Sequence, residues 1–163
     1  MPQVPKTLRP ELITALDQLG SFTAGPRELS LAADGVRLQC EIQSADQLAL
    51  AINRSTVTVD KLRTAPLAKL ETIAAGLAKR LTYLLEPISP IETCQEQCIV
   101  QMRSNPPSKG DDGTTYYELL VRRGGELELV RFRKIPGQPR ETIPATLTRE
   151  VFLRLTSDLA AAE

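Results

Sequence analysis

Hydrophobic and polar residues alternate on both sides of Asp34-Gly35, which predicts a hairpin centred on that dipeptide. Asp-Gly suits the positive φ angles of a type I′ turn, so the loop is expected to contain two residues. Because side chains alternate between the faces of a strand, this register gives one apolar and one polar face. The polar face places Glu28 opposite Glu41, and these like charges repel. The apolar face pairs Leu29 with Cys40, Leu31 with Leu38, and Ala33 with Val36.

A second hairpin is predicted to turn at Gly124-Gly125, again with a two-residue loop. Pairing outward from that loop predicts a core face of five residues: Tyr117, Leu119, Val121, Val130 and Phe132. The opposite face would carry three leucines and two arginines: Leu120, Leu127, Leu129, Arg122 and Arg131. An apolar patch rimmed by charge is often an interaction surface. The alternative is that a helix covers this face and the sheet is buried on both sides.

Further strands and three amphipathic helices complete the prediction. Strands are expected over 48–52 and 94–102, and the change of parity after the first predicts a turn or a bulge near Asn53-Arg54. Helical spacing predicts helices over 10–19, 66–85 and 148–161. The proposed helix signals are a stop at Gly20, a cap at Thr64, and a cap at Thr146 or Thr148.

The predicted fold class is α+β, in the order α-βββ(β)-α-βββ-α, with three amphipathic helices on one or more antiparallel sheets. We expect a single domain over 1–163, built from two divergent strand-and-helix halves, 27–86 and 92–162. Residues 104–114 are rich in turn-forming types and are expected to be a flexible loop. Whether the halves form one sheet or two is left open by the sequence.

Composition limits the chemistry that this chain can perform. The 163 residues include no histidine, which excludes Ser-His-Asp and Cys-His catalysis. A structural zinc site normally needs four Cys or His ligands, and the chain has three cysteines, so neither metal nor cofactor is expected. The 20 basic and 20 acidic residues cancel, which gives no overall attraction to nucleic acid or membrane. Met1–Pro10 lacks the apolar stretch of a signal peptide, and a cytoplasmic location is expected.

The leading prediction is a non-enzymatic protein that binds another protein, and itself as a homodimer, through an exposed sheet face or edge. Leu120, Leu127 and Leu129 would supply apolar contacts, and Arg122 and Arg131 would orient the partner. The element order is similar to that of small type III secretion chaperones. That resemblance implies an α/β homodimer that binds partner proteins, although the neutral charge departs from the acidic character of that family.

Two alternatives remain open at this point. One is a weak single-stranded RNA binder that uses Tyr116, Arg122, Arg131 and Arg133, because arginines and an aromatic ring on a sheet can stack bases. The other is an enzyme with carboxylates in a cleft between the halves, since such groups need only spatial proximity.

Overall fold

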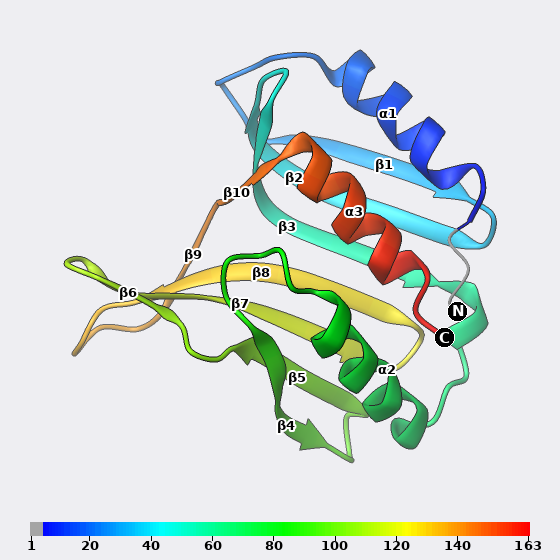
Figure 1. Ribbon diagram of the computed structural model, residues 1–163, viewed down its shortest axis with the longest axis vertical. Helices are drawn as coiled ribbons and strands as arrows, with labels where there is room; N and C mark the ends of the chain where they lie inside the picture. The colour runs from blue at the N-terminus through cyan, green and yellow to red at the C-terminus, as the bar shows by residue number, and fades with distance from the viewer. Residues whose placement is uncertain (1–4) are drawn as a thin grey trace.

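The computed structural model describes residues 5–163; the first four residues of the expected domain lie outside the described part. The chain is an α+β protein in which three helices pack on one face of a ten-stranded antiparallel sheet (Figure 1). The helices are α1 (Leu8–Leu19), α2 (Leu67–Arg80) and α3 (Arg149–Ala160), with a short 3₁₀ helix, η1 (Asp60–Leu62). The strands are β1 (Arg27–Ala33), β2 (Val36–Ala45), β3 (Ala49–Val59), β4 (Ile88–Cys94), β5 (Ile99–Ser104), β6 (Ser108–Gly110), β7 (Gly113–Arg122), β8 (Glu126–Lys134), β9 (Glu141–Ile143) and β10 (Ala145–Thr148).

One continuous sheet runs through the molecule in the order β1-β2-β3-β8-β7-β5-β4. The pairing of β3 with β8 joins the two halves of the chain, which answers the question that the sequence left open. The short strands extend this path, because β6 pairs with β7, β9 with β8, and β10 with β3. The fold class is therefore confirmed, and the later half of the chain contributes seven of the ten strands.

The first hairpin has the predicted register at every pair from Leu29–Cys40 to Ala33–Val36. Asp34 and Gly35 adopt φ angles of 51° and 78°, as the two-residue turn requires. The predicted bulge is also confirmed: the ladder with β2 passes from Arg54 to Ile52 and leaves Asn53 without a partner. This shift lets both ends of β3 point their apolar residues into the same core.

The predicted register of the second hairpin is wrong by one residue. Leu119 lies opposite Leu129 rather than Val130, because the loop holds three residues, from Arg123 to Gly125. Gly125 packs against the end of β3, where an added Cβ would lie 2.4 Å from the carbonyl oxygen of Val59. The backbone amide of Val59 donates a hydrogen bond of 2.9 Å to the Gly125 carbonyl. This contact between the halves selects the longer loop.

Two other segments differ from their predictions. The strand expected over 94–102 is interrupted, since β4 ends at Cys94 and β5 begins at Ile99 after a tight turn. Cys98 occupies that turn with a φ of 54°. Within 104–114, which was expected to be a loop, residues 108–110 form β6 and pair with β7; the flexibility of this segment stays a prediction.

Helices α1 and α3 begin and end within two residues of their predicted limits, but α2 ends five residues early. Thr148 caps α3, because its hydroxyl accepts a hydrogen bond from the amide of Val151, whereas Thr64 is not the cap of α2. After Arg80 the chain leaves the helix and buries Leu81 and Leu84 separately. The next residue, Leu85, is 99% exposed with a positive φ, and this reversal carries Glu86 into the interior.

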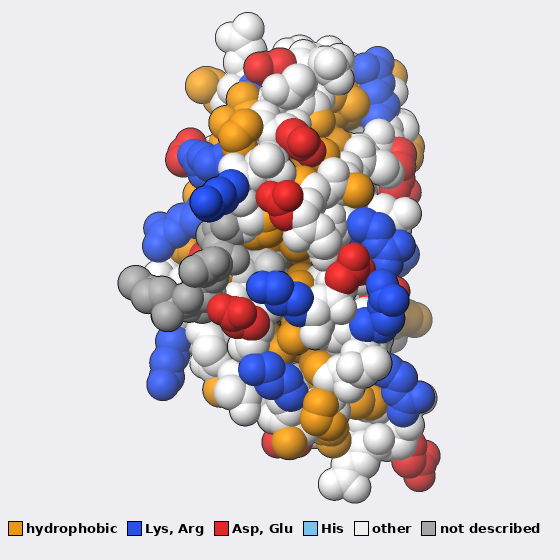
Figure 2. Space-filling view, turned by 90° about the vertical axis from the view of Figure 1, so that its right-hand side faces the viewer, with side chains coloured by type: hydrophobic (Ala, Val, Ile, Leu, Met, Phe, Trp, Pro, Cys, Tyr) orange, Lys and Arg blue, Asp and Glu red, His pale blue; other side chains and the backbone are white. Residues whose placement is uncertain are grey.

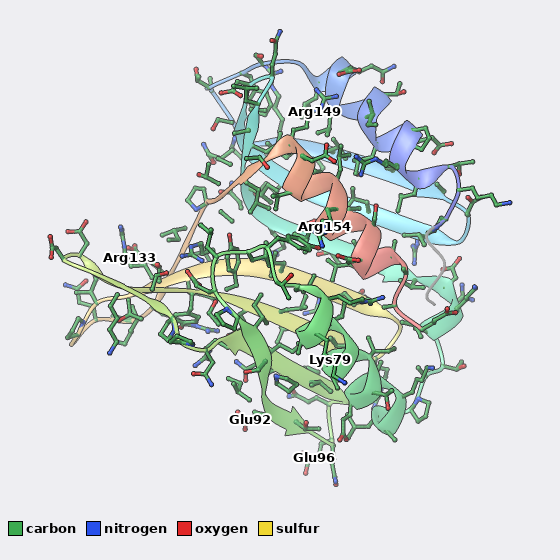
Figure 3. The ribbon with its side chains drawn as sticks, in the orientation of Figure 1. Lys79, Glu92, Glu96, Arg133, Arg149 and Arg154 are labelled. Atoms are coloured by element: carbon green, nitrogen blue, oxygen red, sulfur yellow. The ribbon has the colours of Figure 1, made fainter. Side chains whose placement is uncertain are left out.

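The helices divide the core between the two halves of the sheet. In Figure 1, α1 and α3 lie over the part formed by β1–β3, and α2 lies over β4, β5 and β7. Ion pairs tie α1 to α3, including one of 2.5 Å between Arg149 and Asp17, and Figure 3 shows Arg149 at the start of α3. None of the helices in the described chain has the length and apolar character needed to cross a membrane.

Candidate interaction surface on the open sheet face

Because the three helices of residues 5–163 pack on one side of the sheet, no helix in the described part of the chain covers the other side. In β1, β7 and β8, the even-numbered residues point to this side. In β5 and in most of β2, the odd-numbered residues do so. We call this surface the open face. It is rich in charged and polar residues, as expected for one solvated side of an antiparallel sheet.

One part of the open face is hollowed into a groove of about 580 Å³, which we call the acidic groove. Its charged lining consists of four glutamates and two arginines: Glu28, Glu41, Glu126, Glu128, Arg54 and Arg122. Within this set, Arg122 forms ion pairs of 2.9 Å with both Glu126 and Glu128. Glu28 and Glu41 lie opposite each other on β1 and β2, and neither is in an ion pair within residues 5–163. The groove therefore has an excess of negative charge.

A second hollow, of about 780 Å³, lies where the open face meets the loop before β9, and we call it the basic pocket. Three cationic side chains line it, those of Arg103, Lys134 and Arg140, and its lining includes no acidic residue. The exposed Ile91 adds apolar surface, and the largely buried Tyr116 forms part of the wall. A positively charged rim around apolar surface suits an anionic group attached to an apolar one.

The floor of the basic pocket is a packed cluster of arginines and aromatic rings. The rings of Tyr116 and Phe132 stack with centroids 5.8 Å apart. The guanidinium of Arg140 lies 3.8 Å from the Phe132 ring, and that of Arg103 lies 4.8 Å from the Tyr116 ring. These cation–π contacts fix the guanidinium planes over the rings.

Glu118 holds the two arginines of this cluster in place. Its Oε2 accepts hydrogen bonds from Arg140 at 2.7 Å, from Gln101 at 2.9 Å and from Arg103 at 3.3 Å. Burial alone would raise the pKa of Glu118, but the hydrogen bonds from Arg140, Gln101 and Arg103 outweigh it and lower the pKa. The hydrogen bond to Glu118 in turn raises the pKa of Arg140. One carboxylate thus faces two arginines, and the pocket keeps a positive charge.

The predicted apolar patch does not exist as a surface. With the observed register, Leu127 and Leu129 point into the core and are 0% and 5% exposed, so only Leu120 of the three leucines faces outward. The arginines beside them are also separated, since Arg122 lies on the open face and Arg131 on the helix side. The premise of that prediction is wrong, because a one-residue shift exchanges the two faces of a strand.

The four residues of the RNA prediction are not brought together either. Tyr116 and Arg122 lie on the open face, whereas Arg131 and Arg133 have the opposite parity on β8. Each of the three arginines faces a carboxylate, as in the 2.5 Å ion pair of Arg133 with Glu141. The Tyr116 residue is 8% exposed, so its ring offers little surface on which a base could stack.

Sequence reasoning missed a buried ion pair on the helix side of the sheet. Glu86 receives two hydrogen bonds from Arg131, at 2.8 and 3.2 Å, and one of 2.6 Å from Ser104. The hydroxyl of Ser108 also donates to this carboxylate, and the Arg131 guanidinium lies 4.4 Å from the Tyr117 ring. In the correct register, an arginine at a core-facing position would have been the signal for such a partner.

The cysteines do not form a site with one another in the described structure. Cys40 is buried, and burial raises the pKa of its thiol to about 12, so it is a poor nucleophile at neutral pH. All three cysteines are free thiols. Within residues 5–163, no group of three His, Cys, Asp or Glu residues is placed to hold a metal ion.

Comparison with known proteins adds no further information, so functional inference rests on the geometry described above. Neither protein-family models, nor curated proteins, nor solved structures give a match to this chain.

Proposed function

We propose that this protein binds another protein through the open face of its sheet. The observation that carries the proposal is the one-sided architecture: the sheet carries its three helices on one side and presents hollows of opposite charge on the other. A partner protein can match both hollows at once, because protein interfaces commonly place positive regions against negative ones.

The contacts that hold the side chains of this surface in place support the proposal. The side chains around the basic pocket are held by Glu118 and by ring contacts. A surface that is ordered before binding loses less conformational entropy when it meets a partner. The edge strand β4, by contrast, contains Pro90 and a bulge, features that discourage strand-to-strand pairing at that edge.

The mixed charge of the open face favours a protein over a single-stranded nucleic acid. A polyanion needs a continuous positive track, but the acidic groove lies beside the basic pocket, and the arginines of the earlier RNA prediction face carboxylates. Figure 2 shows the side of the molecule that lies on the right in Figure 1, and basic and acidic side chains are interspersed there as well, with hydrophobic groups in small, separate areas. Charge pattern rather than apolar area would therefore select the partner.

The test uses steric obstruction of the open face. Gln39 is exposed in the acidic groove, and Gln97 is exposed in the turn between β4 and β5, so Gln39→Trp and Gln97→Trp form a matched pair. Each variant and the wild type, tagged at the N-terminus, would be used to capture proteins from an extract of the native host. Thermal unfolding would establish that both variants fold.

We expect proteins that are enriched on the wild type to be lost on Gln39→Trp and retained on Gln97→Trp, as identified by mass spectrometry. Retention of the same proteins on both variants would overturn the proposed function.

A further inference from the structure

We propose that the open face binds a second copy of this chain, with the acidic groove of each copy against the basic pocket of the other. This inference rests on the proposed function and names the partner. One chain carries an acidic groove and a basic pocket on the same face, and these two surfaces are complementary in charge.

The charges of the two hollows are opposite and close in magnitude. Four glutamates and two arginines line the acidic groove, so it has two more negative than positive side chains. Arg103, Lys134 and Arg140 line the basic pocket, and Glu118 beneath them accepts hydrogen bonds from both arginines. Counted over these side chains, the groove has an excess of two negative charges and the pocket an excess of two positive charges.

A two-fold axis satisfies both contacts together. Along β8, Glu126 and Glu128 line the acidic groove and Lys134 lines the basic pocket, with Val130 and Phe132 between them. Consider a second copy generated by a 180° rotation about an axis that lies in the plane of the open face and crosses β8 near Val130 and Phe132. The basic pocket of the second copy then lies over the acidic groove of the first, and its acidic groove lies over the first copy's basic pocket. The resulting interface is the self-complementary kind that closes a dimer.

The open face is large enough for a stable dimer. Seven strands form the main path of the sheet, and at spacings of about 4.8 Å they give a width of about 30 Å. Strands β7 and β8 contain ten and nine residues, which correspond to lengths of about 30 Å at about 3.3 Å per residue. A face of this size can supply the roughly 800 Å² per partner that a standard interface buries.

The pair formed by Glu28 and Glu41 gives a physical reason for the second copy to dock in this arrangement. These two exposed carboxylates face each other across adjacent strands, and like charges in that position repel. Glu41 also lies opposite Arg54 on β3, whereas Glu28 lies on the edge strand. A cationic side chain from the partner's basic pocket would interact with both. Association then gains the attraction to the cation and relieves the repulsion between the glutamates.

The experiment reverses the charge of each hollow separately and then mixes the products. One variant carries Lys134→Glu with Arg140→Glu, and the other carries Glu28→Lys with Glu41→Lys. A control on the exposed side of α2 carries Lys69→Glu with Glu71→Lys, which leaves the net charge unchanged. Molar mass would be measured by sedimentation at about 0.01 M and about 1 M salt, where the Debye length is about 30 Å and about 3 Å.

We expect the wild type and the control to dimerise at low salt and each reversed variant to dimerise at least tenfold more weakly. An equimolar mixture of the two reversed variants should form a heterodimer, because one then presents two acidic hollows and the other two basic ones. High salt should weaken every dimer that forms. Circular dichroism and thermal unfolding would check that the variants fold, and Lys134→Glu alone serves if Arg140→Glu disturbs the cluster around Glu118.

A wild type that stays monomeric at low salt overturns the inference, as do reversed variants that dimerise as tightly as the wild type or fail to pair when mixed. These outcomes leave the proposed function standing if Gln39→Trp still loses a captured protein. If Gln39→Trp loses nothing, the proposed function fails on its own test.

Discussion

Replacement of Arg131 by methionine should destabilise this protein far more than the loss of a typical surface arginine. Methionine keeps much of the aliphatic bulk but removes both hydrogen bonds to Glu86, at 2.8 and 3.2 Å. Glu86 is buried, and its remaining neutral donors are the hydroxyls of Ser104 and Ser108. The substitution therefore leaves a buried carboxylate without its countercharge.

The expected cost is about 3–5 kcal/mol, the range found when one partner of a buried ion pair is removed. At about 2–4 °C per kcal/mol for a chain of this size, the Tm should fall by roughly 6–20 °C. Arg133→Met is the matched control on the same strand, because its partner Glu141 is exposed. Loss of such an exposed pair costs about 0–1 kcal/mol.

The assay is urea unfolding followed by circular dichroism, with the double variant Glu86→Gln plus Arg131→Met completing a mutant cycle. Because glutamine is neutral and can still bond the two serines, the double variant should recover much of the stability that Arg131→Met loses. If Arg131→Met costs no more than Arg133→Met, the reasoning about the buried pair is refuted.

The same pair predicts a dependence of stability on pH. Burial would raise the pKa of Glu86, but hydrogen bonds from Arg131, Ser104 and Ser108 outweigh it, so the folded-state pKa lies below the ordinary value of 4.5. A lowered pKa gives stability that is present above the unfolded-state pKa and is lost as the pH falls through the folded-state pKa. Unfolding of Glu86→Gln should consequently depend less steeply on pH below about 4.5 than unfolding of the wild type.

Three further predictions concern other parts of the sheet. Leu129→Ala should lower the free energy of unfolding, measured in urea, by about 2–5 kcal/mol, because Leu129 is in the core. Leu120→Ala should lower it clearly less, and equal losses would contradict the observed register. Glu28→Gln should raise the free energy of unfolding of the monomer by about 0.2–1 kcal/mol, because Glu28 lies opposite Glu41 on the neighbouring strand and the substitution removes a cross-strand repulsion; a decrease would show that this carboxylate has a stabilising contact. In native protein a thiol reagent should label the partly exposed Cys94 and reach Cys40 only on unfolding, which peptide mapping would reveal; early labelling of Cys40 would contradict its burial.

Local chemistry explains why one hairpin was predicted correctly and the other was not. Asp34-Gly35 favours one loop length, and the alternating pattern around it has a single sensible register. Gly124-Gly125 fits a loop of two or three residues equally well. The choice depends on the contact of Gly125 with Val59, which lies 66 positions earlier in the chain and is brought close only by the pairing of β3 with β8.

The one-residue error in the register of the second hairpin also makes the predicted apolar patch wrong. The wrong register places Leu127 and Leu129 on the outer face, although both are buried. The observed surface features instead involve residues that are distant in sequence. Arg140, in the loop before β9, reaches Glu118 on β7, and Glu86 meets Arg131 from the segment after α2. Contacts of this kind follow from tertiary packing, and no local pattern indicates them.

The charge of the whole chain and the charge of the open face have different physical consequences. A net charge of zero gives no long-range attraction between two copies. The separation of charge within the open face acts only when the copies approach to within about a Debye length, roughly 10 Å at 0.1 M salt. At that range a correctly rotated copy is attracted, and one that places groove against groove is repelled. The face of the wild type should therefore select an orientation more strongly than it accelerates encounter. The reversed variants are different, because each sign reversal changes the net charge by two and both variants depart from neutrality. Like copies of a reversed variant then repel each other at long range, so their association should also be slower, most strongly at low salt.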